Sequence, residues 1–139
     1  MVVIIMVGIL SAIALPAFFN QVQRARQADA QSKIGVILRA QQAYYMENAQ
    51  FANNLESLKI GIRESADYAY NSDQFRNHQT PSGQRVSGAR ALAIPRQNGR
   101  GYMGKIWIET DGSQPTVYSV ICEGDFGATD FMQSKAYCP

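Results

Sequence analysis

Residues 1–19 form an uninterrupted apolar segment, and the first charged side chain after it is Arg24. A helix of that length is about 28 Å long, close to the thickness of the hydrocarbon core of a bilayer. Burial of one large apolar side chain contributes about 1.5–3 kcal/mol, so leaving many of them in water would outweigh the net stability of a small domain. The pattern therefore predicts that this segment lies in lipid, or in a protein core that replaces lipid. The large apolar side chains that need this burial are Val2, Val3, Ile4, Ile5, Val7, Ile9, Leu10, Ile13, Leu15, Phe18 and Phe19.

Two features inside the segment depart from its run of large apolar side chains. Gly8 and Ala12 have the small-x-x-x-small spacing that lets neighbouring helices approach closely. Pro16 has no backbone N–H, and its ring clashes with the carbonyl four residues earlier. We predict a kink or a locally unwound stretch at Pro16, with Gly8 as a second weak point of the helix.

Two other interpretations of this segment stay open from the sequence. A cleaved secretory signal would use the A-x-A-like residues 12–14, but no basic region precedes the apolar run. A plain membrane anchor for a periplasmic domain also fits. Arg24 and Arg26 would by themselves place the domain in the cytosol, and basic residues upstream of Met1 would reverse that orientation. We therefore expect the sequence to lack its first few residues.

The pattern becomes amphipathic after the apolar segment, without a break. Large side chains recur at spacings of three and four residues, as on one face of a helix. We predict one helix from about residue 1 to about residue 52. Residues 1–22 form its apolar half, and residues 23–139 form a globular domain that includes its amphipathic half. The recurring positions are Ile34, Ile37, Leu38, Gln41, Tyr44, Tyr45 and Phe51.

Shorter patterns in the rest of the chain predict a small antiparallel sheet. Its two best strands are residues 102–109 and 116–122, joined by a turn at Asp111 and Gly112. We also expect a helical turn at residues 55–58, capped by Asn53 or Asn54 and stopped by Gly61. The remaining elements are expected to be a short strand at 68–70, a long polar loop at 71–90, an edge strand at 92–94 and an irregular tail at 123–139. We expect Trp107, Tyr102 and Tyr118 to lie in the sheet core and to face the long helix.

Composition gives no support for catalysis. The formal net charge is +2, which is too near balance to indicate a nucleic-acid binder by itself. The chain has one histidine, His78, and neither a G-x-S-x-G nor a Gly-rich phosphate-binding pattern. Asp125 and Asp130 are better explained as solvated loop carboxylates than as an acid–base pair. We expect a protein that is not an enzyme, with no catalytic, cofactor or metal site.

The two cysteines, Cys122 and Cys138, lie near the end of the sequence. They could form a disulfide, contribute to a metal site or remain two buried thiols, and the single histidine disfavours zinc. A bridge that closes a loop of about 15 residues would stabilise the fold by about 3 kcal/mol. We predict the bridge, and with it an oxidising compartment outside the cytosol.

One part of the chain carries positive charge only. Residues 74–108 contain no Asp or Glu, and the balance reverses from Glu109 onward. Three interpretations stay open: an ordinary solvated surface, a basic face that meets an acidic face of the next subunit, or a track that attracts DNA or acidic polysaccharide. The candidate basic face consists of Arg76, Arg85, Arg90, Arg96, Arg100 and Lys105.

The segment VVIIMVGILSAIALPAF resembles the N-terminal signature of type IV pilins and of the related type II secretion pseudopilins. The stretches QVQRARQADAQSKIG and RAQQAYYMENAQFANNLESLKIGI are similar to cyanobacterial major pilins. The resemblance implies an α+β type IV pilin fold, in which a long N-terminal α-helix packs on a small antiparallel β-sheet with a C-terminal disulfide loop. It also implies that a prepilin peptidase cuts, and that the new N-terminal Phe is methylated, upstream of Met1.

The function implied by the resemblance is that of a structural filament subunit. Such a subunit waits in the inner membrane, and the pilus assembly machinery then packs it into a homo-oligomeric, extracellular type IV pilus on the cell surface. The pilus would serve twitching motility, adhesion or DNA uptake in natural competence. The alternative is a type II secretion pseudopilin, which forms a periplasmic pseudopilus. Many major pseudopilins bind calcium in a C-terminal loop, and Cys122 and Cys138 occupy that region here, which favours the pilin.

Overall fold

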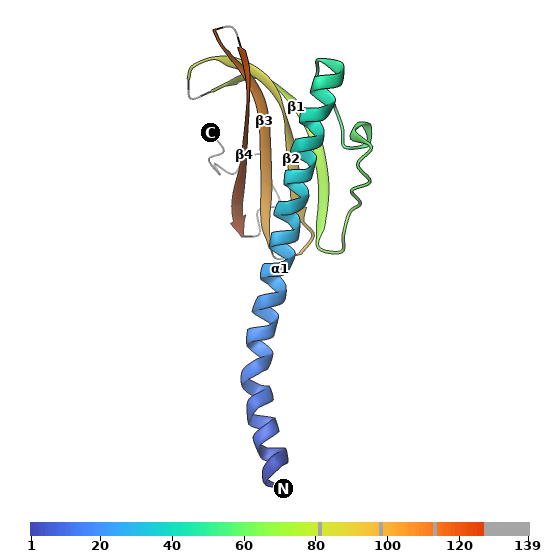
Figure 1. Ribbon diagram of the computed structural model, residues 1–139. Helices are drawn as coiled ribbons and strands as arrows, with labels where there is room; N and C mark the ends of the chain where they lie inside the picture. Colours follow the sequence, from blue (N-terminus) through green and yellow to red (C-terminus); the bar gives the residue numbers. More distant parts are fainter. Residues whose placement is uncertain (81, 98, 113, 127–139) are drawn as a thin grey trace.

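The computed structural model describes residues 1–80, 82–97, 99–112 and 114–126. The first half of a long helix, α1 (Val2–Asn48), projects away from the sheet (Figure 1), and residues 2–22 of this helix are called the stalk below. The second half of α1 packs along one face of a four-stranded sheet (Figure 1). The strands are β1 (Tyr68–Gln79), β2 (Arg85–Pro95), β3 (Arg100–Asp111) and β4 (Gln114–Phe126), and each pairs antiparallel with the next in that order. The predicted α+β fold is confirmed.

The helix is continuous over 47 residues, which corresponds to a length of about 70 Å. It ends four residues earlier than predicted. Ala49 adopts a left-handed conformation (φ 55°), and its N–H binds the carbonyl of Tyr45. The next residues, Phe51 and Ala52, are buried, but they lie in the chain that turns back toward the sheet rather than in the helix. Apolar periodicity alone therefore placed them on the wrong element.

Small residues on the sheet allow the helix to approach it. A Cβ atom at Gly104 of β3 would lie 2.6 Å from Cγ2 of Ile34 and 2.8 Å from Cδ1 of Leu38. The neighbouring strand β2 presents Ala89 and Ala91 to the same core. With large side chains at these positions the helix would stand farther from the strands, since protein cores have little free volume. The helix-facing side of the sheet is thus shaped for α1.

The segment between Asn71 and Arg90, predicted as a loop, is mostly strand. β1 continues to Gln79 and β2 starts at Arg85, with a bulge between Phe75 and His78 where the register shifts. The stretch expected to be an edge strand lies inside β2, which has β1 on one side and β3 on the other. The predicted hairpin between β3 and β4 is confirmed, although β4 extends beyond residue 122 to Phe126.

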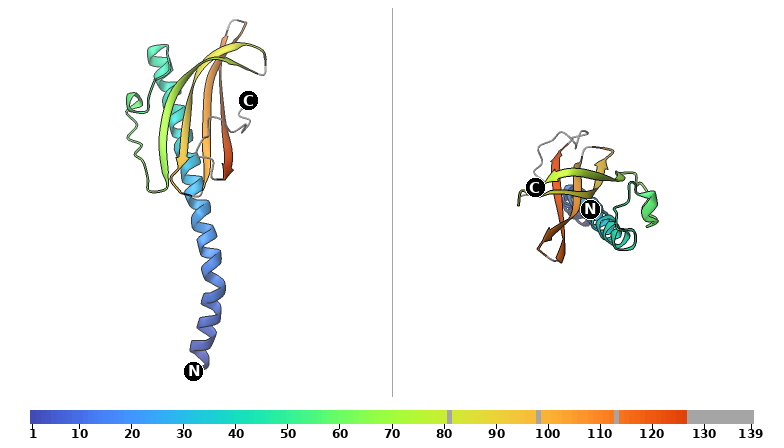
Figure 2. Two further views of the ribbon diagram at one scale, coloured as in Figure 1. Left: turned by 180° about the vertical axis from the view of Figure 1, so that it is seen from behind. Right: turned by 90° about the horizontal axis from the view of Figure 1, so that it is seen from above.

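The segment between α1 and β1 contains a 3₁₀ turn, η1 (Glu56–Leu58). Asn54 accepts hydrogen bonds from the backbone N–H of Ser57 (2.8 Å) and from its hydroxyl, which confirms the predicted cap. The turn ends at Lys59 in a left-handed conformation rather than at Gly61. Seen from above in Figure 2, this segment lies beside α1, so the helix is covered by the sheet on one side and by the η1 segment on another.

The face of the sheet that turns away from α1 has its own aromatic contact. Trp107 pairs in register with Gly88 and Tyr118, one position away from the core residue Ile106. Because successive side chains of a strand point to opposite faces, Trp107 and Tyr118 lie away from the helix. Their rings stack at 5.9 Å and 15°. The prediction that they face the helix is wrong, whereas Tyr102, which is 1% exposed in the helix-facing core, lies as predicted.

Candidate functional site

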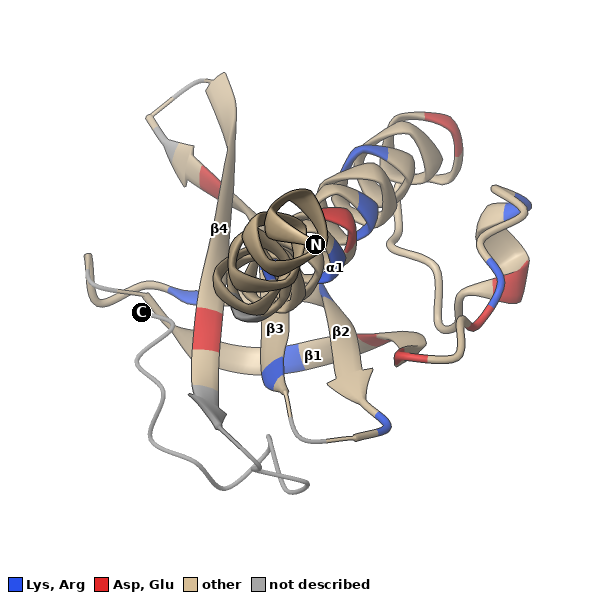
Figure 3. Cartoon of the chain, turned by 90° about the horizontal axis from the view of Figure 1, so that it is seen from below, with Lys and Arg blue, Asp and Glu red and all other residues tan. Residues whose placement is uncertain are grey.

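The first half of α1 is not packed against the other residues that the structure describes. The eleven large apolar side chains of residues 2–19 that the pilin resemblance would place in a filament core are between 54% and 76% exposed. By length and composition α1 can span a membrane, since its most apolar stretch has a mean hydropathy of 2.7 and none of that stretch is buried within the chain. Viewed along the stalk in Figure 3, charged residues gather around the sheet and the second half of α1. This exposed apolar surface is the main candidate for assembly.

Gly8 and Pro16 both lie within α1, which is assigned as helix without interruption from Val2 to Asn48. A Cβ atom at Gly8 would meet nothing within 4 Å, so no contact with the described residues requires glycine there. A neighbouring helix that packs closely at this position would supply such a reason. The roles of Gly8 and Pro16 in packing and melting remain predictions.

A buried amide fixes the second half of α1 to the sheet. Gln41 is fully buried, and its side chain donates to the carbonyl of Ala52 (3.1 Å) and to Oγ of Ser72 (2.9 Å). Its Oε1 accepts from the N–H of Ala52 at 2.8 Å. Ser72 in turn donates to the carbonyl of Arg90 (3.1 Å), so one network joins α1, the turn after it, β1 and β2. The sequence placed Gln41 on the buried face without giving a partner for it.

The six residues of the candidate basic face do not gather in one place. Arg90 forms a bidentate ion pair with Asp73, in which Nε and Nη2 donate to the two carboxylate oxygens at 2.5 Å each. The other pairs are Arg96 with Glu64, and Arg100 with Glu123 at 2.7 Å. Lys105 stands next to Arg90 across the strands, and burial and that neighbouring charge lower the pKa of Lys105. Most of the positive charge on the strands is therefore balanced or enclosed within the chain.

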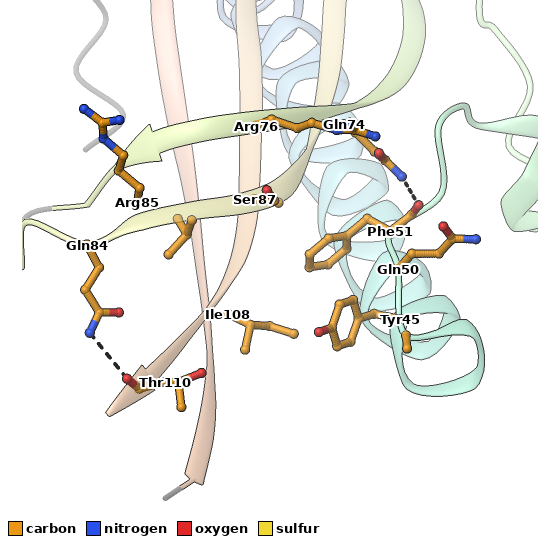
Figure 4. A pocket seen from close by; sticks show the side chains of 13 residues that line it. Tyr45, Gln50, Phe51, Gln74, Arg76, Gln84, Arg85, Ser87, Ile108 and Thr110 are labelled. Atoms are coloured by element: carbon orange, nitrogen blue, oxygen red, sulfur yellow. Dashed lines mark hydrogen bonds between the residues drawn. The ribbon is translucent and has the colours of Figure 1, made fainter. Parts of the chain in front are cut away.

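The remaining two arginines of the set, Arg76 and Arg85, are exposed and form no ion pair with any residue that the structure describes. They line a pocket of about 490 Å³ next to the end of α1 (Figure 4). The two rings that enter this pocket from the helix side, Tyr45 and Phe51, lie 4.8 Å apart between centroids. The structure thus divides the candidate basic face into a paired part and a pocket part.

Two predicted features concern residues that the structure does not describe. Cys122 lies in β4 opposite Met103, but its predicted partner Cys138 is outside the described residues, and so is Asp130. The disulfide therefore remains a prediction. Among the described residues, no three or more His, Cys, Asp or Glu side chains gather in a way that could hold a metal ion.

The fold and the exposed apolar helix define a class of structural subunits, in which a small folded domain carries one helix whose apolar side chains are left exposed. The chain matches the family model described as type IV pilin-like G and H over residues 27–135, well over half of its length. It belongs to this type IV pilin-like family. The match begins after the apolar segment, so it is independent of the N-terminal signature. No curated protein and no solved structure matches the chain.

Membership in this family makes the protein a structural subunit of the pilin or pseudopilin type, which oligomerises into a filament. The family is structural rather than enzymatic.

Proposed function

We propose that the chain is a subunit of a type IV pilus that polymerises through residues 2–19 into an extracellular filament. The single observation that supports this most is the contrast within α1, whose first half is exposed whereas its second half shares a hydrophobic core with the sheet. An apolar surface of this size needs a bilayer before assembly and neighbouring helices after it.

In this proposal the inner membrane holds the unassembled subunit by the stalk, with the sheet domain outside. The assembly machinery, acting after prepilin peptidase, transfers the stalk from lipid to a bundle of identical stalks. Burial of apolar area changes little in that transfer, because lipid tails and aliphatic side chains are similarly apolar. Gly8 would permit close helix contacts, and Pro16 would mark the point at which α1 bends or melts on packing.

The test is electron microscopy of material sheared from the cell surface, combined with mass spectrometry of the filaments. We expect thin filaments that contain this chain with its stalk intact and with Cys122 joined to Cys138. A chain found only as a membrane-bound monomer would refute the filament. Short filaments confined to the periplasm would instead identify the pseudopilin alternative.

A substitution in the stalk makes this test sharper. Ile9→Lys places a charge near the middle of the apolar segment, where insertion into a bilayer costs about 2.5–3.5 kcal/mol. We expect filaments to be lost while the melting temperature of the sheet domain stays unchanged. The matched control is Met46→Lys, since Met46 is 80% exposed at the other end of the same helix, and this variant should still assemble.

A further inference from the structure

The pocket at the end of α1 lies where the sheet curves away from the helix (Figures 1 and 2). α1 ends at Asn48 at the end of the domain opposite the stalk, where β1 and β2 curve away from it and the tip of the hairpin formed by β3 and β4 reaches past it (Figures 1 and 2). Helix-facing positions there, such as Ser87 and Ile108, are left without a helix above them and line the pocket. The opening is therefore a consequence of the fold and not of one side chain's conformation.

The lining combines an apolar floor with amide groups. In Figure 4 the ring of Tyr45 points from the helix end toward Ile108, and Phe51 lies above it. Gln74 donates to the carbonyl of Phe51, and Gln84 donates to the carbonyl of Thr110 (3.3 Å). Each of these amides uses its NH₂ group in the contact, which leaves its carbonyl oxygen available to accept from a ligand hydroxyl.

The mouth of the pocket carries positive charge without a counter-charge. Arg76 and Arg85 extend from the adjacent strands β1 and β2, and among the described residues no Asp or Glu lines the pocket. In Figure 4 the guanidinium of Arg85 points away from the pocket. Both arginine side chains are exposed and long, so they can turn over a bound group. A guanidinium binds a carboxylate with two parallel hydrogen bonds, which is a stronger contact than either bond alone.

We propose that this pocket binds an acidic sugar unit, such as a uronic acid within a polysaccharide. Its volume lies in the range of small-molecule sites, its amides match sugar hydroxyls, and its two arginines match the carboxylate. Single-stranded nucleic acid fits less well, because successive bases stack on several exposed aromatic faces, whereas this pocket offers one partly exposed ring, Tyr45, beside Phe51, which is 6% exposed. The inference rests on the proposed function, since assembly would repeat the pocket along a filament surface.

Isothermal titration of the full chain in detergent micelles tests the site, with tetragalacturonate as the probe. Maltotetraose serves as the neutral sugar and short single-stranded DNA as the other anion. We expect tetragalacturonate to bind, and maltotetraose to bind at least about tenfold more weakly, because it lacks the carboxylates. In the double variant Arg76→Gln/Arg85→Gln, the affinity for tetragalacturonate should fall by at least about tenfold.

The matched control is Arg39→Gln/Arg63→Gln, which removes the same charge from two exposed arginines that do not line this pocket. Equal losses in the two double variants, or no binding by the unchanged chain, would overturn the proposal. DNA that binds more tightly than the sugar and depends on Arg76 and Arg85 would also overturn it. Binding is measured on unassembled chains, so its failure is distinct from a failure to form filaments, which electron microscopy reports.

Discussion

The two halves of α1 belong to one helix but have opposite surroundings. Ile9 is 59% exposed, whereas Ile37 is fully buried against the sheet. The same residue type in the same backbone conformation thus contributes to two different equilibria, the folding of one chain and its insertion or assembly. Ile37 stabilises the fold of a single chain, whereas the side chain of Ile9 becomes buried only in a bilayer or against other chains. The comparison shows that folding and assembly are separated along the length of one helix.

The largest test of this separation replaces each isoleucine in turn. Ile37→Ala leaves a cavity in the core and should lower the free energy of unfolding by about 2–5 kcal/mol. Ile9→Ala should leave it unchanged, because no contact with the folded domain is lost. Thermal and denaturant unfolding of the detergent-solubilised chain, followed by circular dichroism, measures both. Similar losses in the two variants would show that the halves are not independent.

A smaller effect is expected at the polar contact that holds the buried half in place. Gln41→Leu leaves the N–H and the carbonyl of Ala52 buried without their partner, and an unsatisfied buried group costs about 1–3 kcal/mol. The control is Gln21→Leu, at an exposed position of the same helix. Hydrogen exchange should show faster opening at Ala52 in the first variant only. Unchanged exchange there would mean that the turn is held by other contacts, such as the burial of Phe51.

The smallest predicted effect concerns pH, and it is confined to the sheet domain, because the stalk has no titratable side chain. Burial, and then the charge of Lys105, lower the pKa of His78 below its usual 6.5. The unfolded chain therefore binds the proton more readily, and stability is lost as pH falls through the ordinary value of the unfolded histidine. The melting temperature of His78→Gln should consequently fall less than that of the unchanged chain between about pH 7.5 and about pH 5. Equal pH dependence of the two proteins would rule out this contribution.

The elements that the sequence predicted well are those with strong local signals. The helix carries a long apolar run followed by a regular period, and the hairpin between β3 and β4 carries an Asp-Gly turn between apolar strands. The turn capped by Asn54 is equally local. These features need no knowledge of distant residues, so they can be recognised before the fold is known.

The first hairpin was missed because its strands are specified by their partners. β1 contains Asn71, Asp73 and Asn77, residue types that single-strand propensity disfavours. Asp73 is stabilised there by Arg90 on β2, a pairing that only the register reveals. The pocket was hidden for the same reason, since Tyr45 and Arg76 line one cavity only after the sheet has formed and packed beside the helix end. The sequence supplied the charge pattern but not its division into paired and unpaired arginines.

The continuity of α1 has a mechanical consequence. Tension along a filament built on the stalks would enter the domain through the helix axis, which runs along the strands in Figure 1. The force would slide Ile34 and Leu38 across Gly104 rather than peel one strand from the next. The hydrogen bonds between strands lie across that direction, so the sheet would stay intact until the helix slipped. The resistance of the domain to pulling would therefore be set by the packing of α1 on the sheet and not by the pairing of the strands.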